Sequence, residues 1–330
     1  MQPIGANAQL LSNDALAKWL IEDFPFRIQL SSIFPFIPVS GHSLRYAATG
    51  ALTPGNAIGQ NSPIPEDTKQ PNDPNRVYRF AEIATHFRVS YKAQDIFSSN
   101  ANDQVAVQMA LAVRELLYKF WILFERGDAS ANPEEFDGLL SLVNPGNTID
   151  LQGRPLTLED LDRAKELVRA NDGRCVVIFT SSIGKRAINA SHYVRGLRPD
   201  SEEMEFTCPD GTIKFEHVLK FDGAPVYIND LNQVYECGHN HVGAAISPEN
   251  VLELNGMEPP LATNIWFLSL GPGNLHGIKP EKAQNIITRS TILADASTLV
   301  YHLSMPAGIA LGSSAALSVI RNATIPVCGK

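Results

Sequence analysis

The chain is organised around residues 102–126, NDQVAVQMALAVRELLYKFWILFER. No Gly or Pro interrupts this stretch and strong helix formers fill it, so it predicts one long helix. Asn100 or Asn102 can cap its first turn, and Gly127 stands where a left-handed residue often ends a helix. Residues 120–124 are apolar on every face. A helix of this kind must be covered on several sides, so we expect it to be the structural centre.

The composition is that of a globular protein, and its charge disfavours direct binding of nucleic acid. The 330 residues are 44% hydrophobic and 19% charged, which supplies enough apolar side chains for a sizeable core. The length predicts about two domains. The net charge of -8 would repel DNA and RNA. The sequence also contains no run of Lys and Arg of the kind that binds along a phosphate backbone.

The N-terminus and the cysteines indicate a soluble protein that folds in a reducing cytoplasm. Residues 1–20 lack the basic and apolar segments of a signal peptide, and no apolar run approaches the roughly 20 residues of a membrane span. The cysteines are too widely spaced for a disulfide scaffold. They are Cys175, Cys208, Cys237 and Cys328, and whether they form disulfides stays open.

The segments before the long helix predict two extended parts that lie on other surfaces. Residues 1–38 combine a short capped helix at 15–21 with Phe–Pro pairs, which favour extended backbone while the rings require burial. Residues 39–92 predict two strands, at 39–46 and 76–91, joined by a polar segment rich in Gly, Pro and Asn. A connection of that length fits an arm that reaches a neighbour.

The chain after the long helix mixes helices and buried strands without a regular βαβ repeat, which predicts the α+β class. Thr157 and Asp160 form a capping-box pattern with Asp in place of the usual Glu. A short helix is expected to start near Pro133, and two longer helices are expected at 157–169 and 182–192. The expected strands lie at 175–180, on both sides of a turn at 222–225, and at 264–270, 286–304 and 307–323; residues 235–262 are loop-like.

No catalytic or cofactor-binding motif survives inspection. Residues 271–277, GPGNLHG, contain the glycines of a phosphate loop, but Pro280 and a strand-like run follow them instead of a helix. The acid pairs Glu134–Glu135 and Glu202–Glu203 are typical of solvated surface. Tyr118, Trp121 and Phe124 share a helix face and are expected to pack in a core. We therefore expect no enzyme active site and no cofactor.

One cluster resembles a metal site. Cys237, His239 and His241 alternate within five residues, which on a strand would place all three on one side. Zinc sites usually draw their ligands from two separated segments, and no second cluster is obvious. A polar loop with an incidental thiol is the preferred interpretation, and a metal-binding enzyme is the remote alternative.

The order of these parts resembles the major capsid protein of tailed bacteriophages, with the Johnson or Hong Kong 97-type fold that encapsulin shells share. The resemblance covers essentially the whole chain. Four segments carry it: residues 39–46 (VSGHSLRY), 132–139 (NPEEFDGL), 221–230 (FDGAPVYIND) and 263–271 (TNIWFLSLG). They are similar to the start of the extended loop, the loop after the long helix, and two strands of the axial domain.

The resemblance implies a division of the chain into an arm, a loop and two domains. These are an N-terminal arm at 1–38, an extended loop at 39–92, a peripheral domain at 93–152 and 281–304, and an axial domain at 153–280 and 305–330.

The function that the resemblance implies is the assembly of a closed shell. Pentamers and hexamers of the chain would close into the icosahedral head of a phage virion, assembled in the bacterial cytoplasm, which encloses DNA without binding it specifically. Other partners would be a portal, a separate scaffold protein and decoration proteins, and the use of the last two stays open. A covalent cross-link through Lys69 also stays open. The alternative is an encapsulin-type cellular compartment, and residues 132–139 favour the phage.

Overall fold

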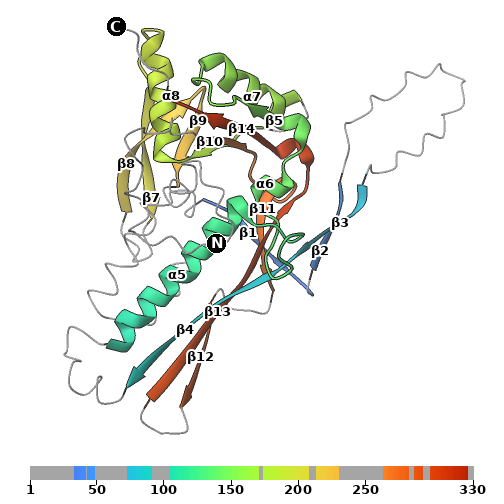
Figure 1. The fold of residues 1–330 in the computed structure, drawn as a ribbon, viewed down its shortest axis with the longest axis vertical. Coiled ribbons are helices and arrows are strands. Elements are labelled where there is room, and N and C mark those ends of the chain that lie inside the picture. Colours follow the sequence, from blue (N-terminus) through green and yellow to red (C-terminus); the bar gives the residue numbers. More distant parts are fainter. Residues whose placement is uncertain are drawn as a thin grey trace, which may run out of the picture.

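The computed structural model describes residues 33–41, 43–48, 73–90, 104–170, 174–207, 213–229, 263–281, 286–292 and 298–325. Within these ranges the chain is a mixture of helices and sheets, as the α+β class predicts (Figure 1). The expected helix at 15–21, the caps Asn100 and Asn102, and the loop at 235–262 lie outside the described residues.

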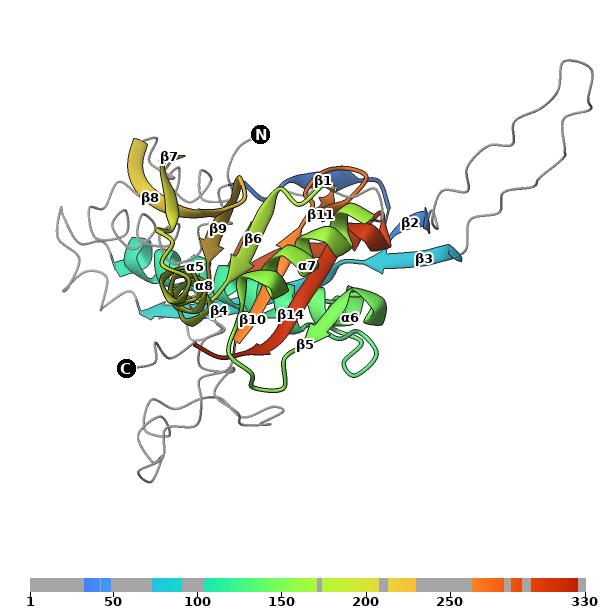
Figure 2. The same ribbon diagram turned by 90° about the horizontal axis from the view of Figure 1, so that it is seen from above.

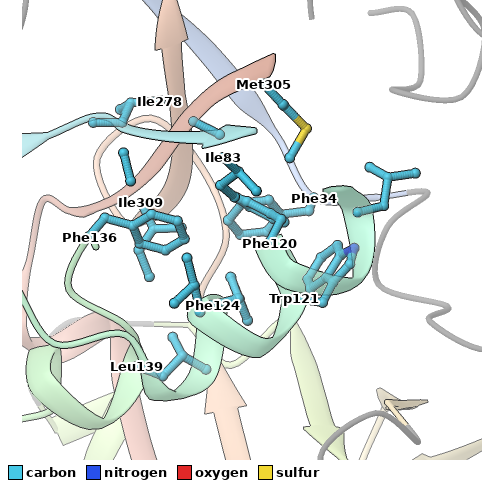
Figure 3. Packing of buried hydrophobic residues seen from close by; sticks show 14 of the residues in the cluster. Phe34, Ile83, Phe120, Trp121, Phe124, Phe136, Leu139, Ile278, Met305 and Ile309 are labelled. Carbon is cyan, nitrogen blue, oxygen red and sulfur yellow. The ribbon is translucent and has the colours of Figure 1, made fainter. Parts of the chain in front are cut away.

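The predicted long helix is confirmed as α5, Gln104–Arg126. Phe120, Trp121 and Phe124 near its end are fully buried, while Ile122 retains partial exposure. Phe34 covers this end from the chain's N-terminal side, with ring centroids 5.1 Å from Phe124 and 6.0 Å from Trp121 (Figure 3). Aromatic rings in edge-to-face contact add to the burial of apolar area, so this cluster fixes the helix in the core.

A five-stranded sheet lies against α5 and extends beyond the core (Figure 1). Its long strand β13 pairs antiparallel with β4, β11 and β12, and β1 adds parallel to β11. The strands are β1 Phe36–Val39, β4 Ala81–Ser90, β11 Leu275–Pro280, β12 Ile287–Ile292 and β13 Thr298–Leu311. In β4 the buried Ala81, Ile83 and Val89 alternate with exposed residues, which is the period of a strand covered on one face.

Four expected strands differ from the structure. The strand predicted at 39–46 is divided between β1, which ends at Val39 and pairs with β11, and β2 (Ser43–Ala48), which pairs with β3. The strand predicted at 76–91 is broken at Phe80, and its halves pair in different sheets. The strand predicted at 286–304 is the antiparallel pair of β12 and β13. The last strand, predicted at 307–323, is divided because β13 ends at Leu311 and β14 starts at Leu317. At Gly312 a Cβ atom would lie 2.5 Å from the carbonyl oxygen of Gly273, so the chain passes very close to another backbone there.

A seven-stranded mixed sheet has its central strands buried on both faces. Its order is β5, β14, β10, β6, β9, β8, β7. One face packs on the helices α7 and α8 (Figure 2), and the other packs on the core cluster that contains the end of α5. The strands are β5 Thr148–Asp150, β6 Val177–Thr180, β7 Asp200–Thr207, β8 Ile213–Phe221, β9 Ala224–Ile228, β10 Thr263–Leu268 and β14 Leu317–Ala323; the helices are α7 Leu158–Ala170 and α8 Ser182–Val194.

Alternate residues of the central strands serve the two faces. In β10, Ile265 and Phe267 contact the layer with α7 and α8, while Trp266 and Leu268 belong to the core around α5. In β6, Ile178 likewise contacts the layer with α7 and α8, while Val177 and Phe179 belong to the core around α5. These strands read as uninterrupted apolar runs because both of their faces are covered.

A separate pair of strands, β2 Ser43–Ala48 and β3 Asp73–Arg79, runs antiparallel at one side of the molecule (Figure 1). The buried hydroxyl of Tyr78 donates a hydrogen bond of 2.7 Å to the carbonyl oxygen of Leu311. This contact ties β3 to the end of β13.

The predicted helix starts at 157 and 182 are confirmed, and so is the predicted capping box at 157. The amide of Asp160 donates to Thr157 Oγ1 at 3.3 Å, and the amide of Thr157 donates to Asp160 Oδ2 at 3.1 Å, so the capping box works with Asp. Ser181 caps α8 by accepting a hydrogen bond from the amide of Gly184 at 3.3 Å.

Two predictions for the segment after α5 are wrong. Residues near Pro133 form turns, and the helix there, α6, is the single turn Leu139–Leu142. Gly127 does not have the left-handed conformation of a C-cap. Glycine is needed there for space, because a Cβ atom would lie 2.2 Å from the carbonyl oxygen of Phe136. Two short 3-10 turns, Pro145–Asn147 and Ser314–Ala316, complete the described elements.

No helix within the described ranges is long and apolar enough to cross a membrane.

Candidate functional site

The predicted metal candidates and cross-linking residues lie outside the described ranges. They are Cys237, His239 and His241, and Lys69, Cys208 and Cys328. Within the described ranges, no three His, Cys, Asp or Glu side chains are grouped so that they could hold a metal ion.

The glycine-rich stretch is a turn between two strands. Gly271 has a φ of 145°, and its amide donates to the carbonyl oxygen of Leu275 at 3.1 Å. The chain continues directly into β11, so no helix opens on these glycines. Phosphate loops depend on helix amides at this position, and here a strand follows the glycines instead.

The titratable groups in the described ranges are perturbed mainly by burial or by surface hydrogen bonds. Burial lowers the pKa of His276, whose ring nitrogen lies 3.1 Å from the carbonyl oxygen of Asn274. Burial also raises the pKa of the Cys175 thiol to about 11. Glu135 pairs with Lys119 at 3.1 Å, and Glu134 is exposed. These features are those of ordinary core and surface residues.

The loop that follows α5 is held by its own sequence. The amide of Gly138 donates to the carbonyl oxygen of Gly127 at 2.7 Å, and the amide of Ala129 donates to Asp137 Oδ1 at 3.0 Å. Phe136 is buried, with its ring 5.7 Å from that of Phe120. Phe136, Asp137 and Gly138 of the NPEEFDGL segment therefore close the loop over the end of α5.

A buried carboxylate connects α5 to the seven-stranded sheet. Glu125 is 3% exposed, and its Oε1 accepts hydrogen bonds from Trp266 Nε1 at 3.2 Å and Asn264 Nδ2 at 3.5 Å. Sequence reasoning missed this junction. The available signal was an acidic residue directly after the apolar run at 120–124.

Large apolar side chains are exposed on two parts of the seven-stranded region. Tyr193, Val194 and Leu197 at the end of α8 are 61%, 55% and 51% exposed, and Phe215 on β8 is 63% exposed. Exposed apolar groups gathered in this way mark interaction surfaces more often than single ones do.

Solved structures of protein shells match nearly the whole chain. The holo-SrpI encapsulin complex from Synechococcus elongatus PCC 7942 has 16% sequence identity and a TM-score of 0.65, over 92% of this chain and 89% of that chain. The capsid of a native GTA particle has 14% identity and a TM-score of 0.55, over 95% and 92%. A chain of Microbacterium phage Oxtober96 has 14% identity and a TM-score of 0.53, over 94% and 91%.

The chain has the Hong Kong 97-type shell fold. The predicted resemblance to that fold is therefore confirmed. No protein-family model and no curated protein matches the sequence. Since the identities are near 15%, the likeness concerns the fold alone.

Proposed function

We propose that this chain is a structural shell protein, the major capsid protein of a tailed bacteriophage, which assembles as pentamers and hexamers into an icosahedral head. The observation that carries the proposal is the match of its fold to shell subunits along more than nine-tenths of its length. The match also covers 89–92% of those shell chains, so it concerns the fold of the whole subunit and not one part of it.

Two contacts of the structure support the division into an arm, a loop and two domains that the resemblance implies. We assign 1–38 to the N-terminal arm, 39–92 to the extended loop, 93–152 and 281–304 to the peripheral domain, and 153–280 and 305–330 to the axial domain. The pairing of β4 with β13 would anchor the extended loop in the peripheral domain. The packing of α5 against the seven-stranded sheet, with the Glu125 junction, would join the two domains rigidly.

Assembly would then proceed through contacts between different surfaces of identical copies. Such heterologous contacts close into rings when the rotation between neighbours divides a full turn evenly, and rings of five and six together close a shell. The activity requires no catalytic group. The partners in this proposal are further copies of the chain, with a scaffold, a portal and decoration proteins beside them, and the enclosed DNA is not gripped by the subunit.

An encapsulin-type compartment is the second candidate. The observation that favours it is the higher TM-score to the SrpI encapsulin, 0.65, compared with 0.55 and 0.53 for the capsid of the GTA particle and the phage chain. The resemblance of the NPEEFDGL segment to phage shell subunits favours the phage.

The contents of assembled particles distinguish the two candidates. The full chain is expressed in bacteria together with its neighbouring genes, and particles are purified and treated with nuclease. DNA protected inside the particles supports the phage capsid and its location in a virion. A co-purifying protein cargo without protected DNA supports the encapsulin.

A further inference from the structure

Charges of opposite sign are segregated on two adjoining parts of the seven-stranded region. Residues 182–199, which form α8 and the turn after it, contain four Lys or Arg and no acid. Residues 200–205, the first part of β7, contain four acids and no Lys or Arg. The overall net charge of -8 does not require such a division, so the local arrangement carries information about what these surfaces meet.

The basic patch is defined as Arg186, Arg195 and Arg198 with the apolar Tyr193, Val194 and Leu197. All six residues are exposed. Arg195 pairs with Glu159 of α7 at 2.7 Å. Arg186 and Arg198 have no acidic partner among the described residues. The exposed apolar side chains therefore share this segment with two arginines that pair with no acid of the described residues.

The acidic patch is defined as Glu203, Glu205 and Phe215. In the β7–β8 pair Glu205 stands directly opposite Phe215, and Glu203 stands opposite His217. Directly opposed residues project from the same face, so both carboxylates lie beside the exposed ring. Neither carboxylate has a cationic partner in the described part of the chain, whereas Glu202, on the other face, pairs with Lys220.

Each patch has the anatomy of one half of an interface. An apolar centre with a charged rim is the usual composition of a protein–protein contact, and aromatic and arginine side chains contribute most strongly to such contacts. Two basic patches or two acidic patches would repel each other, which disfavours a two-fold symmetric contact through either one. Opposite patches attract, and that contact is heterologous.

We propose that the basic patch of one subunit docks against the acidic patch of the next subunit around the ring. This inference rests on the proposed shell function and specifies which surfaces make the contact. Tyr193 and Leu197 would cover Phe215 of the neighbour, and Arg198 would meet Glu203 or Glu205. Because β7 is the edge strand of its sheet, its outer side is accessible to an approaching copy.

Charge reversal provides the test. A basic-reversed chain carries Arg186→Glu and Arg198→Glu, and an acid-reversed chain carries Glu203→Lys and Glu205→Lys. Each variant, expressed in full length with the neighbouring genes, is expected to lose ring assembly by about tenfold or more, because every contact then opposes like charges. The matched control carries Arg163→Glu and Arg169→Glu, two exposed arginines of α7, and should assemble like the unaltered chain.

Co-expression of the two reversed chains gives the most specific result. When the two chains alternate around a ring, every contact again opposes unlike charges. Alternation closes only in rings with an even number of members, so native mass spectrometry should show six-membered rings restored and five-membered rings still depleted.

Four outcomes would contradict the proposal or its basis. Assembly of both reversed chains at the unaltered level would overturn this inference alone and leave the shell function standing. Equal loss of assembly in the α7 control, or restoration of five- and six-membered rings alike on co-expression, would also overturn it. An unaltered chain that forms no rings would instead overturn the proposed function.

Discussion

The indole Nε1 of Trp266 donates a hydrogen bond of 3.2 Å to the carboxylate of Glu125, at the point where α5 meets the seven-stranded sheet. Both side chains are buried, and Trp266 comes from a strand that lies 141 residues away in the sequence. A buried donor that loses its acceptor costs more free energy than the bond itself contributes. This pair therefore joins the two parts of the subunit firmly.

The first prediction concerns this pair. Glu125→Ala should lower the free energy of unfolding by about 1–3 kcal/mol, because Trp266 Nε1 is left buried without this acceptor. Glu125→Gln keeps an acceptor oxygen and should cost less. Urea unfolding of the two variants, followed by tryptophan fluorescence, measures the difference. Equal stability of the unaltered and Glu125→Ala chains would contradict the assignment.

The second prediction concerns the glycines that close the loop after α5. A Cβ atom at Gly138 would lie 2.5 Å from the carbonyl oxygen of Leu123, and one at Gly127 would lie 2.2 Å from that of Phe136. Each Gly→Ala change should destabilise the fold by about 1–3 kcal/mol or more, since a backbone atom must move. Gly273→Ala is the matched control, because no atom lies within 4 Å of its added Cβ. Thermal unfolding should separate the control clearly from the other two variants.

The third prediction is a pH dependence at the start of α7. Burial raises the pKa of Asp160, but hydrogen bonds from Arg154 and Thr157 outweigh it, so the pKa in the folded chain is below the usual value of 3.8. The folded state thus binds this proton less readily than the unfolded state, and the contribution to stability is full above pH 4 or so. It is lost as the pH falls through the folded pKa. Asp160→Asn should flatten the stability curve in this acidic window.

The pKa of Asp162, two residues further along the same helix, is shifted in the opposite direction. Burial and the nearby carboxylates of Asp222 and Glu166 raise its pKa in the folded chain. Its ionised form is therefore disfavoured by folding, and this penalty develops as the pH rises through the unfolded pKa. Asp162→Asn should increase the melting temperature at neutral pH. A decrease there would contradict the account of both carboxylates.

The fourth prediction concerns the thiol of Cys175. Burial raises its pKa to about 11, so hardly any of the reactive thiolate is present at pH 8. Iodoacetamide should label Cys175 slowly in the folded chain and rapidly in urea, as measured by mass spectrometry of the peptide that contains it. Rapid labelling of the folded chain would show that the side chain is accessible and ionised.

The sequence predicted the local elements well where the signal was local. The long helix, the capping box at Thr157 and the buried strand predicted at 175–180 depend on neighbouring residues, and all three are present. The strand breaks were not predicted, because they depend on distant partners. Residues 76–91 look continuous, yet β3 pairs with β2, and β4 with β13, more than 200 residues away.

The candidate surfaces were harder to predict than the fold class. The role of Gly127 depends on the backbone at Phe136, and the buried carboxylate of Glu125 depends on β10, so neither could be read from periodicity. The charge segregation between α8 and β7 is visible in the sequence. Its significance appears only once Glu203 and Glu205 are found beside the exposed Phe215.

Electron microscopy of the purified full chain tests the central claim most directly. The chain is expressed alone and with its neighbouring genes, separated by size-exclusion chromatography and imaged in negative stain. The shell function predicts closed particles, or rings of five and six copies, in at least the co-expressed sample. Monomers or dimers alone in both samples would contradict it.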